Sequence, residues 1–149
     1  MIKINKDKIV ADGLEKEIDK IVVINWSKNY LSFSSRIADC VKYEKGIEAF
    51  YEELNNAGLT GFVLVDNNIV NLNNIASLHI EFYQYAGISI HQSSKENAEL
   101  YHLSIVCKNG RKETIPFRTF KETEQCYHAI DAALTDLRNN EAVASLLNN

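Results

Sequence analysis

Residues 100–122 read LYHLSIVCKNGRKETIPFRTFKE, and this stretch decides the fold. Two β-rich runs flank Asn109-Gly110, and Asn-Gly is the strongest short hairpin signal because both residues tolerate positive φ. A three-residue loop ending at Gly110 pairs Leu103 with Ile115 and gathers the apolar residues on one face, whereas a two-residue loop divides them between both faces. We therefore predict the three-residue loop, with Gly110 in the left-handed conformation.

A helix is predicted to follow this hairpin. Thr119 and Glu122 match a capping box, with a hydroxyl at the N-cap and a carboxylate three residues later. The residues beyond form one apolar stripe at helical spacing, made of Cys126, Ile130, Ala133, Leu134 and Leu137. We expect a helix over about 120–138 that ends at Asn139-Asn140 and packs across the hairpin. Pro116 lacks an N–H, so its strand is expected at a sheet edge.

The middle of the chain contains a second predicted helix and more strands. Residues 35–57 have an apolar side and an acidic side, and Gly46 leaves a kink or two short helices as the alternative. A hairpin over 62–72 with a two-residue turn at Asn67-Asn68 follows. Residues 78–91 then alternate apolar and polar, which is typical of a half-buried strand.

The two ends of the chain are less clear. A hairpin over 21–33 is slightly favoured by β-branched residues, and one helix over 14–31 is the alternative. The tail over 141–149 is read as a short extra helix. Together these elements predict an α+β fold: a mostly antiparallel sheet of about five to seven strands, with helices at about 35–57 and 120–138.

One domain over residues 1–149 is expected from the length, and residues 59–138 form its clearest sheet-plus-helix unit. The order of elements in 59–138, strands closed by one amphipathic helix, resembles the pleckstrin-homology type of split barrel. The resemblance lies in the arrangement and assigns no site residues.

The composition is that of an ordinary globular protein, 46% hydrophobic, with a net charge of −4 and a pI of about 5.6. This acidic balance argues against nucleic acid and anionic membranes as partners. No apolar run reaches the ~18 residues that span a bilayer, and the N-terminus does not read as a signal peptide. Cys40, Cys107 and Cys126 lack C-x-x-C spacing, so we read them as buried reduced thiols of a cytoplasmic protein.

The sequence contains no known catalytic or metal-binding motif. The four histidines have no metal-ligand spacing, so we assign no catalytic residues, no metal ligands and no cofactor. A Cys–His nucleophile built from Cys40 or Cys107 is the alternative, and core thiols are the favoured reading.

Two candidate sites remain, and each has a simpler reading. The polar side of the strand over 78–91 is a candidate partner-binding face, because aromatic and histidine side chains are typical of interfaces; coverage by the helix over 35–57 is the simpler reading. The second candidate site is a group of basic residues at the predicted hairpin tip, and the simpler interpretation is that they are solvated in an exposed turn. The face comprises His79, Glu81, Tyr83, Tyr85 and His91, and the tip comprises Lys108, Arg111 and Lys112.

We expect a non-enzymatic protein that acts by binding another macromolecule, most simply a protein, as an inhibitor or immunity-type factor would. One alternative is a small-molecule-binding domain or an unrecognised enzyme, with a pocket between the sheet and the C-terminal helix. The other is a structural homo-oligomer, assembled through the tail over 143–147 or the edge strand near Pro116.

Overall fold

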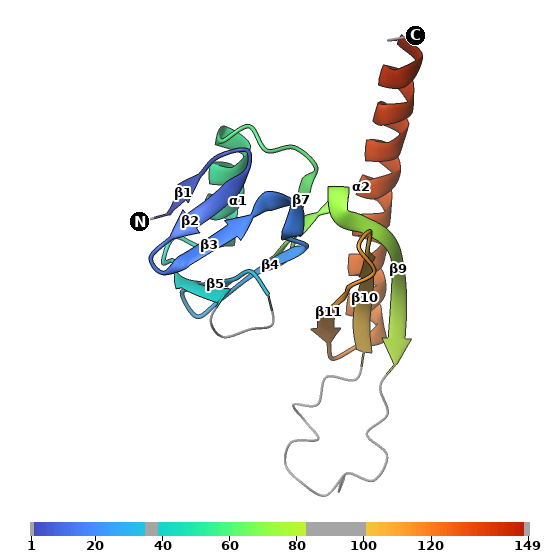
Figure 1. Cartoon of the computed structure of the whole chain (residues 1–149). Helices are drawn as coiled ribbons and strands as arrows, with labels where there is room; N and C mark the ends of the chain where they lie inside the picture. The colour runs from blue at the N-terminus through green and yellow to red at the C-terminus, as the bar shows by residue number, and fades with distance from the viewer. Residues whose placement is uncertain (1, 35–38, 83–100, 148–149) are drawn as a thin grey trace, which may run out of the picture.

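The structure is a computed structural model, and it describes residues 2–34, 39–82 and 101–147. Its elements confirm the α+β class (Figure 1). In chain order they are β1 (Lys3–Ile4), β2 (Lys8–Ala11), β3 (Leu14–Glu17), the 3-10 turn η1 (Ile18–Lys20), β4 (Val23–Ser27), β5 (Tyr30–Ser32), β6 (Cys40–Lys42), α1 (Ile47–Asn56), β7 (Phe62–Val65), β8 (Asn68–Asn71), the 3-10 turn η3 (Leu72–Asn74), β9 (Ile75–Phe82), β10 (Tyr101–Cys107), β11 (Lys112–Phe117) and α2 (Phe120–Leu147).

The described strands form three antiparallel sheets: β1-β2-β3, β6-β5-β4-β8-β7 and β11-β10-β9. In Figure 1 the first two sheets and α1 lie on one side of the molecule, and the third sheet and α2 lie on the other. The strands of the two hairpins over 62–117 therefore belong to different sheets.

Two apolar clusters fill these two sides. The first cluster consists of Ile9, Ile21, Ile24, Leu31, Phe33, Tyr43, Ile47, Phe50, Leu54, Leu59, Phe62 and Ile69. The second cluster consists of Val22, Val70, Leu72, Ile75, Leu103, Ile105, Cys107, Ile115, Cys126, Ile130 and Leu134. All of β8 is buried, because its neighbouring residues Ile69 and Val70 point to opposite sheet faces and enter different clusters. Strand β8 is thus the link between the two sides.

The hairpin β10–β11 has the predicted register. Leu103 lies opposite Ile115 and Tyr101 lies opposite Phe117. Gly110 has a φ of +89°, the left-handed conformation expected of it. Strand β11 is an edge strand in its sheet, as Pro116 predicted.

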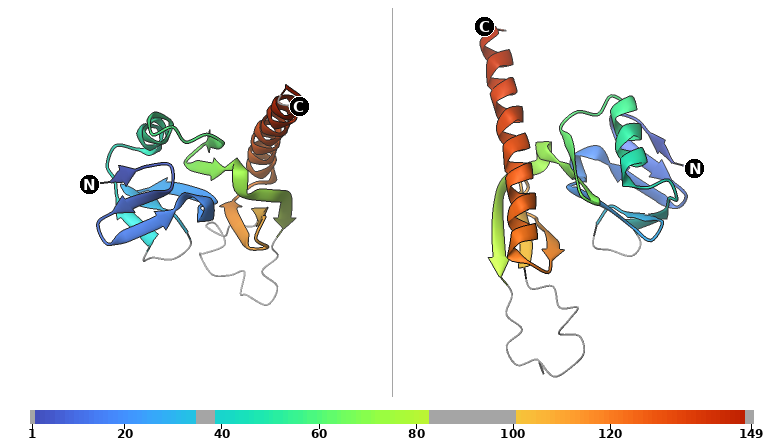
Figure 2. Two further views of the ribbon diagram at one scale, coloured as in Figure 1. Left: turned by 45° about the horizontal axis from the view of Figure 1, so that its top comes forward. Right: turned by 180° about the vertical axis from the view of Figure 1, so that it is seen from behind.

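Helix α2 packs across this hairpin as expected, and Cys126, Ile130 and Leu134 are buried against it (Figure 2). The Oγ1 of Thr119 accepts a hydrogen bond from the backbone N–H of Glu122 at 3.2 Å, so the predicted cap is present. The predicted end at Asn139-Asn140 is wrong, because α2 continues to Leu147. Asparagine is unfavourable inside a helix by only a few tenths of a kcal/mol, too little to stop one. The tail is therefore part of α2 and not a separate helix.

The hairpin over 21–33 is confirmed and the single helix over 14–31 is excluded. Strands β4 and β5 pair with a two-residue turn at Lys28-Asn29, where both residues have positive φ. In β7–β8 the turn lies at Asp66-Asn67, one residue earlier than predicted. The partner of each residue shifts by two positions, so every side chain keeps its predicted face.

The helix predicted over 35–57 is correct only for α1. Residues 40–42 form β6, which pairs with β5, and residues 35–38 lie outside the described part of the chain. Gly46 has a φ of +92° and precedes the first residue of α1, so it ends the extended segment rather than kinking a helix. Helix α1 buries Ile47, Phe50 and Leu54 in the first cluster.

Two asparagine side chains, the buried Asn71 of β8 and the partly buried Asn74 of η3, tie these elements to the segment after β3. The Nδ2 of Asn71 donates to the carbonyl oxygens of Ile21 and Ile18 at 3.0 and 3.3 Å. The Nδ2 of Asn74 donates to the carbonyl oxygens of Ile21 and Asp19 at 2.7 and 2.8 Å. These bonds satisfy backbone acceptors that no strand reaches.

Candidate functional site

The predicted partner-binding face is described only in part. His79 and Glu81 lie on one face of β9, whereas Tyr83, Tyr85 and His91 lie outside the described residues. His79 is exposed, and its Nε2 lies 3.0 Å from the hydroxyl of Ser77. Helix α1 does not cover His79 and Glu81, the described part of this face, because its apolar side packs into the first cluster.

The predicted basic tip is joined to acidic neighbours. The Nζ of Lys112 lies 2.7 Å from the carboxylate of Glu81, and a guanidinium nitrogen of Arg111 lies 3.0 Å from that of Glu113. Lys108 is exposed in the turn. Lys112 and Glu81 come from the two predicted sites, so the structure brings those sites together across β10. The paired carboxylates reduce the positive charge that the tip presents.

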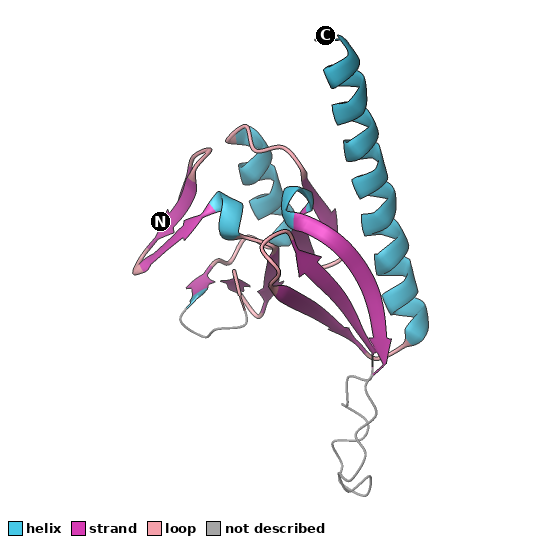
Figure 3. Ribbon diagram, turned by 45° about the vertical axis from the view of Figure 1, so that its right-hand side comes forward, coloured by secondary structure: helices cyan, strands magenta, loops and turns pink. Residues whose placement is uncertain are grey.

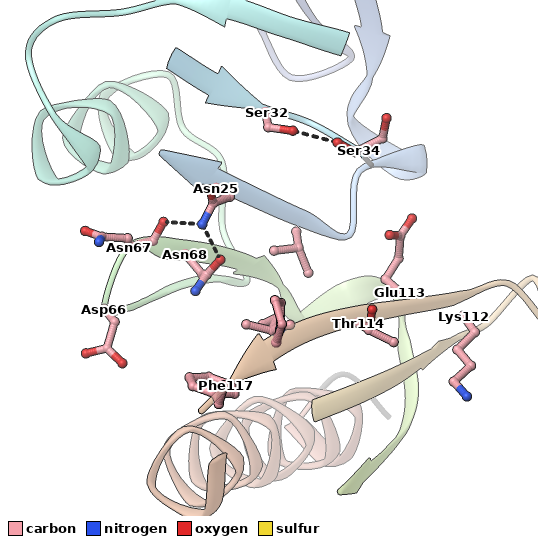
Figure 4. A pocket seen from close by; sticks show the side chains of 13 residues that line it. Asn25, Ser32, Ser34, Asp66, Asn67, Asn68, Lys112, Glu113, Thr114 and Phe117 are labelled. Atoms are coloured by element: carbon pink, nitrogen blue, oxygen red, sulfur yellow. Dashed lines mark hydrogen bonds between the residues drawn. The ribbon is translucent and has the colours of Figure 1, made fainter. Parts of the chain in front are cut away.

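A cleft of about 540 Å³ lies between the two sides of the molecule (Figure 4). One wall is formed by all six residues of β11, Lys112 to Phe117. The opposite wall comes from β4, β5 and the β7–β8 turn. Its lining residues are Val23, Asn25, Ser32, Ser34, Asp66, Asn67 and Asn68. The cleft is therefore bounded along its length by one edge strand.

The backbone of β11 has a fixed orientation toward this cleft. The N–H of Cys107 donates to the carbonyl oxygen of Arg111 at 2.7 Å, so these two opposed residues form a hydrogen-bonded pair. Such pairs recur at every second residue of an antiparallel ladder, and the opposed residues Leu103 and Ile115 are therefore one of them. Because successive residues alternate, the N–H and C=O of Thr114 point away from β10, toward the open edge. Pro116 has the same orientation, so its missing N–H costs no bond within the sheet.

Amide and hydroxyl groups dominate the facing wall. The Nδ2 of Asn25 donates to the Oδ1 of Asn68 at 3.0 Å and to the carbonyl oxygen of Asn67 at 3.4 Å. The hydroxyl of Ser32 donates to the carbonyl oxygen of Ser34 at 2.6 Å (Figure 4). No histidine or cysteine is among the residues that line the cleft. This wall suits hydrogen bonding more than proton transfer or nucleophilic attack.

The thiols considered as nucleophiles lie elsewhere. Burial raises the pKa of Cys126 to about 12, and burial together with the charge of Glu113 raises the pKa of Cys107. Both thiols are thus protonated at neutral pH, as core thiols are. Cys40 is exposed in β6, so the prediction that all three cysteines are buried is wrong for this residue. Cys40 points to solvent from the edge strand β6, whereas the next residue, Val41, packs against the first cluster.

The described residues contain no group of three or more His, Cys, Asp and Glu side chains placed to share a metal ion. None of their helices combines the length and apolarity that crossing a membrane requires.

The space between α2 and the sheet, where a small-molecule pocket was considered, is occupied by the second cluster. The cleft lies instead beside β11, and sequence reasoning missed it. Its residues come from four segments that no local pattern connects. Of its features, the sequence predicted only a turn near Asn67 and the edge position of the strand that contains Pro116.

The fold and the cleft define an α+β protein with a cleft bounded by an edge strand. Comparisons of the chain with protein families, with curated proteins and with solved structures gave no match.

Proposed function

We propose that this protein is a non-enzymatic binding protein whose partner is another protein. The observation that carries the proposal is the cleft along β11, where an edge strand faces amide and hydroxyl groups. An edge strand can receive an extended segment of a partner chain, because its outward N–H and C=O groups bond the added backbone. The volume of about 540 Å³ accommodates a few residues of such a segment.

The chemistry of the lining supports binding over catalysis. Its ionisable side chains are Asp66, Lys112 and Glu113, and the last two are in ion pairs with Glu81 and Arg111. A general acid or base needs a group free to exchange its proton with a substrate. The net charge of −4 is compatible with an inhibitor or immunity-type role against a basic partner surface.

The proposal is tested by site-specific photo-crosslinking in cells of the source organism. Thr114 is exposed on the cleft wall and Ser145 is exposed near the end of α2, so a crosslinking residue at each position forms a matched pair. We expect one stoichiometric protein adduct from position 114 and none of the same mass from position 145. Identical adducts from both positions, or none from 114, would contradict the proposal.

A second variant pair tests the backbone contact. Thr114→Pro removes an outward N–H without removing a bond to β10, whereas Thr114→Ser keeps it. We expect the proline variant to remain folded by circular dichroism and to lose the adduct at a second cleft position, Asn67. The serine variant retains it. Equal adducts from the two variants would show that the partner does not use this edge.

A further inference from the structure

Among the described strands, the three-stranded sheet has a second edge, formed by β9. Figure 3 shows β9 as the curved outer strand of this sheet, on the side away from β11. In β10 the backbone groups of His102 and Ser104 point away from β11 and toward β9. Their opposed residues, Glu81 and His79, therefore direct their own N–H and C=O groups toward β10. The N–H and C=O groups of Leu78, Ile80 and Phe82 therefore point outward along the open edge.

The two edges differ in their protection against pairing. Strand β11 carries Pro116, which removes one outward donor. Strand β9 has neither proline nor lysine, and its one irregularity lies at the far end, where Cys107 pairs with Ile75. Phe82 is 58% exposed at the other end. A regular edge of this kind, with Leu78, Ile80 and Phe82 along one face, is a template for another strand.

We propose that a second copy of this chain adds to the edge of β9, in antiparallel orientation, across a two-fold axis at Ile80. A symmetric pair of strands must place outward residues opposite outward residues, so the axis must pass through a residue position. His79 and Ile80 are the two central positions of the regular segment over 77–82. Over 77–82 the Ile80 axis gives the bonded pairs Leu78–Phe82, Ile80–Ile80 and Phe82–Leu78. The His79 axis gives only Leu78–Ile80 and its symmetry mate.

Side-chain chemistry selects the same axis. With the axis at Ile80, His79 lies opposite Glu81 of the second copy, and this pair occurs twice. With the axis at His79, the two His79 side chains lie opposite each other. On the other face, the Ile80 axis places the exposed ring of Phe82 against Leu78 of the second copy, an aromatic–aliphatic pair that stabilises sheets.

This inference goes beyond the proposed function and is independent of it. The cleft adjoins β11, at the opposite edge of the same sheet, so a dimer through β9 leaves it accessible. The assembly is a continuous six-stranded sheet, with α2 of each copy on the same face.

A charge pair at one exposed position tests the dimer. His79→Glu places like charges opposite each other twice, whereas His79→Lys places opposite charges at the same two positions. By sedimentation velocity we expect the unaltered chain and the lysine variant to be dimeric at about 100 µM. The glutamate variant should dissociate at a protein concentration roughly tenfold higher than the other two chains do. A monomeric unaltered chain, or equal dissociation of the two variants, would overturn the proposal.

Cysteine crosslinking tests the register, in a Cys40→Ser background that removes the exposed native thiol. An equimolar mixture of His79→Cys and Glu81→Cys chains places two thiols directly opposite each other, at a distance that a disulfide spans. We expect this mixture to form a covalent dimer faster than either chain alone. Fastest crosslinking of the His79→Cys chain by itself would place the axis at His79 and refute the register.

Discussion

Ile130→Ala removes a side chain that is 0% exposed at the centre of the contact between α2 and the sheet. The substitution deletes three carbons, and about 0.8 kcal/mol per buried methylene gives a transfer cost of about 2.4 kcal/mol. The cavity that remains adds to this value, so we expect a loss of about 3–4 kcal/mol in the free energy of unfolding. With a urea slope of about 2 kcal/mol/M, in the middle of the range of about 1–3 for small proteins, the midpoint should fall by about 1.5–2 M.

Leu147→Ala is the matched control in the same helix, because Leu147 is 81% exposed. Its effect should stay within about 0.5 kcal/mol. Unfolding is followed by circular dichroism, which reports the helices, and by fluorescence of Trp26, which packs against the first cluster. A midpoint that hardly moves in Ile130→Ala, or moves equally in the control, would refute the packing of α2 described above.

Three further predictions concern the cap, the thiols and alkaline pH. Thr119→Ala should destabilise the protein by about 1 kcal/mol in urea, and Thr119→Ser should not, since only the hydroxyl caps α2. One thiol per folded chain, Cys40, should react rapidly with a thiol reagent at pH 8, and Cys107 and Cys126 should react only after unfolding. Burial and the hydrogen bond to Glu53 raise the pKa of Tyr43, so its contribution to stability is complete below pH ~10 and is lost above it. Tyr43→Phe should flatten that alkaline decline, which urea titrations at several pH values would measure.

The parts of the fold that the sequence predicted are those in which local chemistry and burial agree. Asn109-Gly110 marks the turn between β10 and β11. Only the three-residue loop places Leu103 and Ile115 on one face, and this requirement predicted the register of the two strands. The stripe through Ile130 identified the buried side of α2 for the same reason. In β7–β8 the alternation fixed the faces, and the turn position was less constrained because a two-position shift preserves them.

The errors occurred where tertiary contacts decide. Residues 40–42 have an apolar pattern compatible with a helix, but pairing with β5 holds them extended. Strands β2 and β3 carried no clear local signal, because each has only four residues and three of the four in β3 are charged; their pairing buries Ile9 in the first cluster. The end of α2 projects past the sheet, as Figure 2 shows, and no cap residue marks it. The cleft combines distant segments, so its location required the structure.

Strand β11 presents outward-facing backbone groups to the cleft, and amide hydrogen exchange measures this directly. The N–H of Ile115 faces β10, and the N–H of Thr114 faces the cleft. We expect the amide of Ile115 to exchange at least about 100-fold more slowly than that of Thr114 in the isolated protein. Equal protection of the two amides would contradict this orientation of β11.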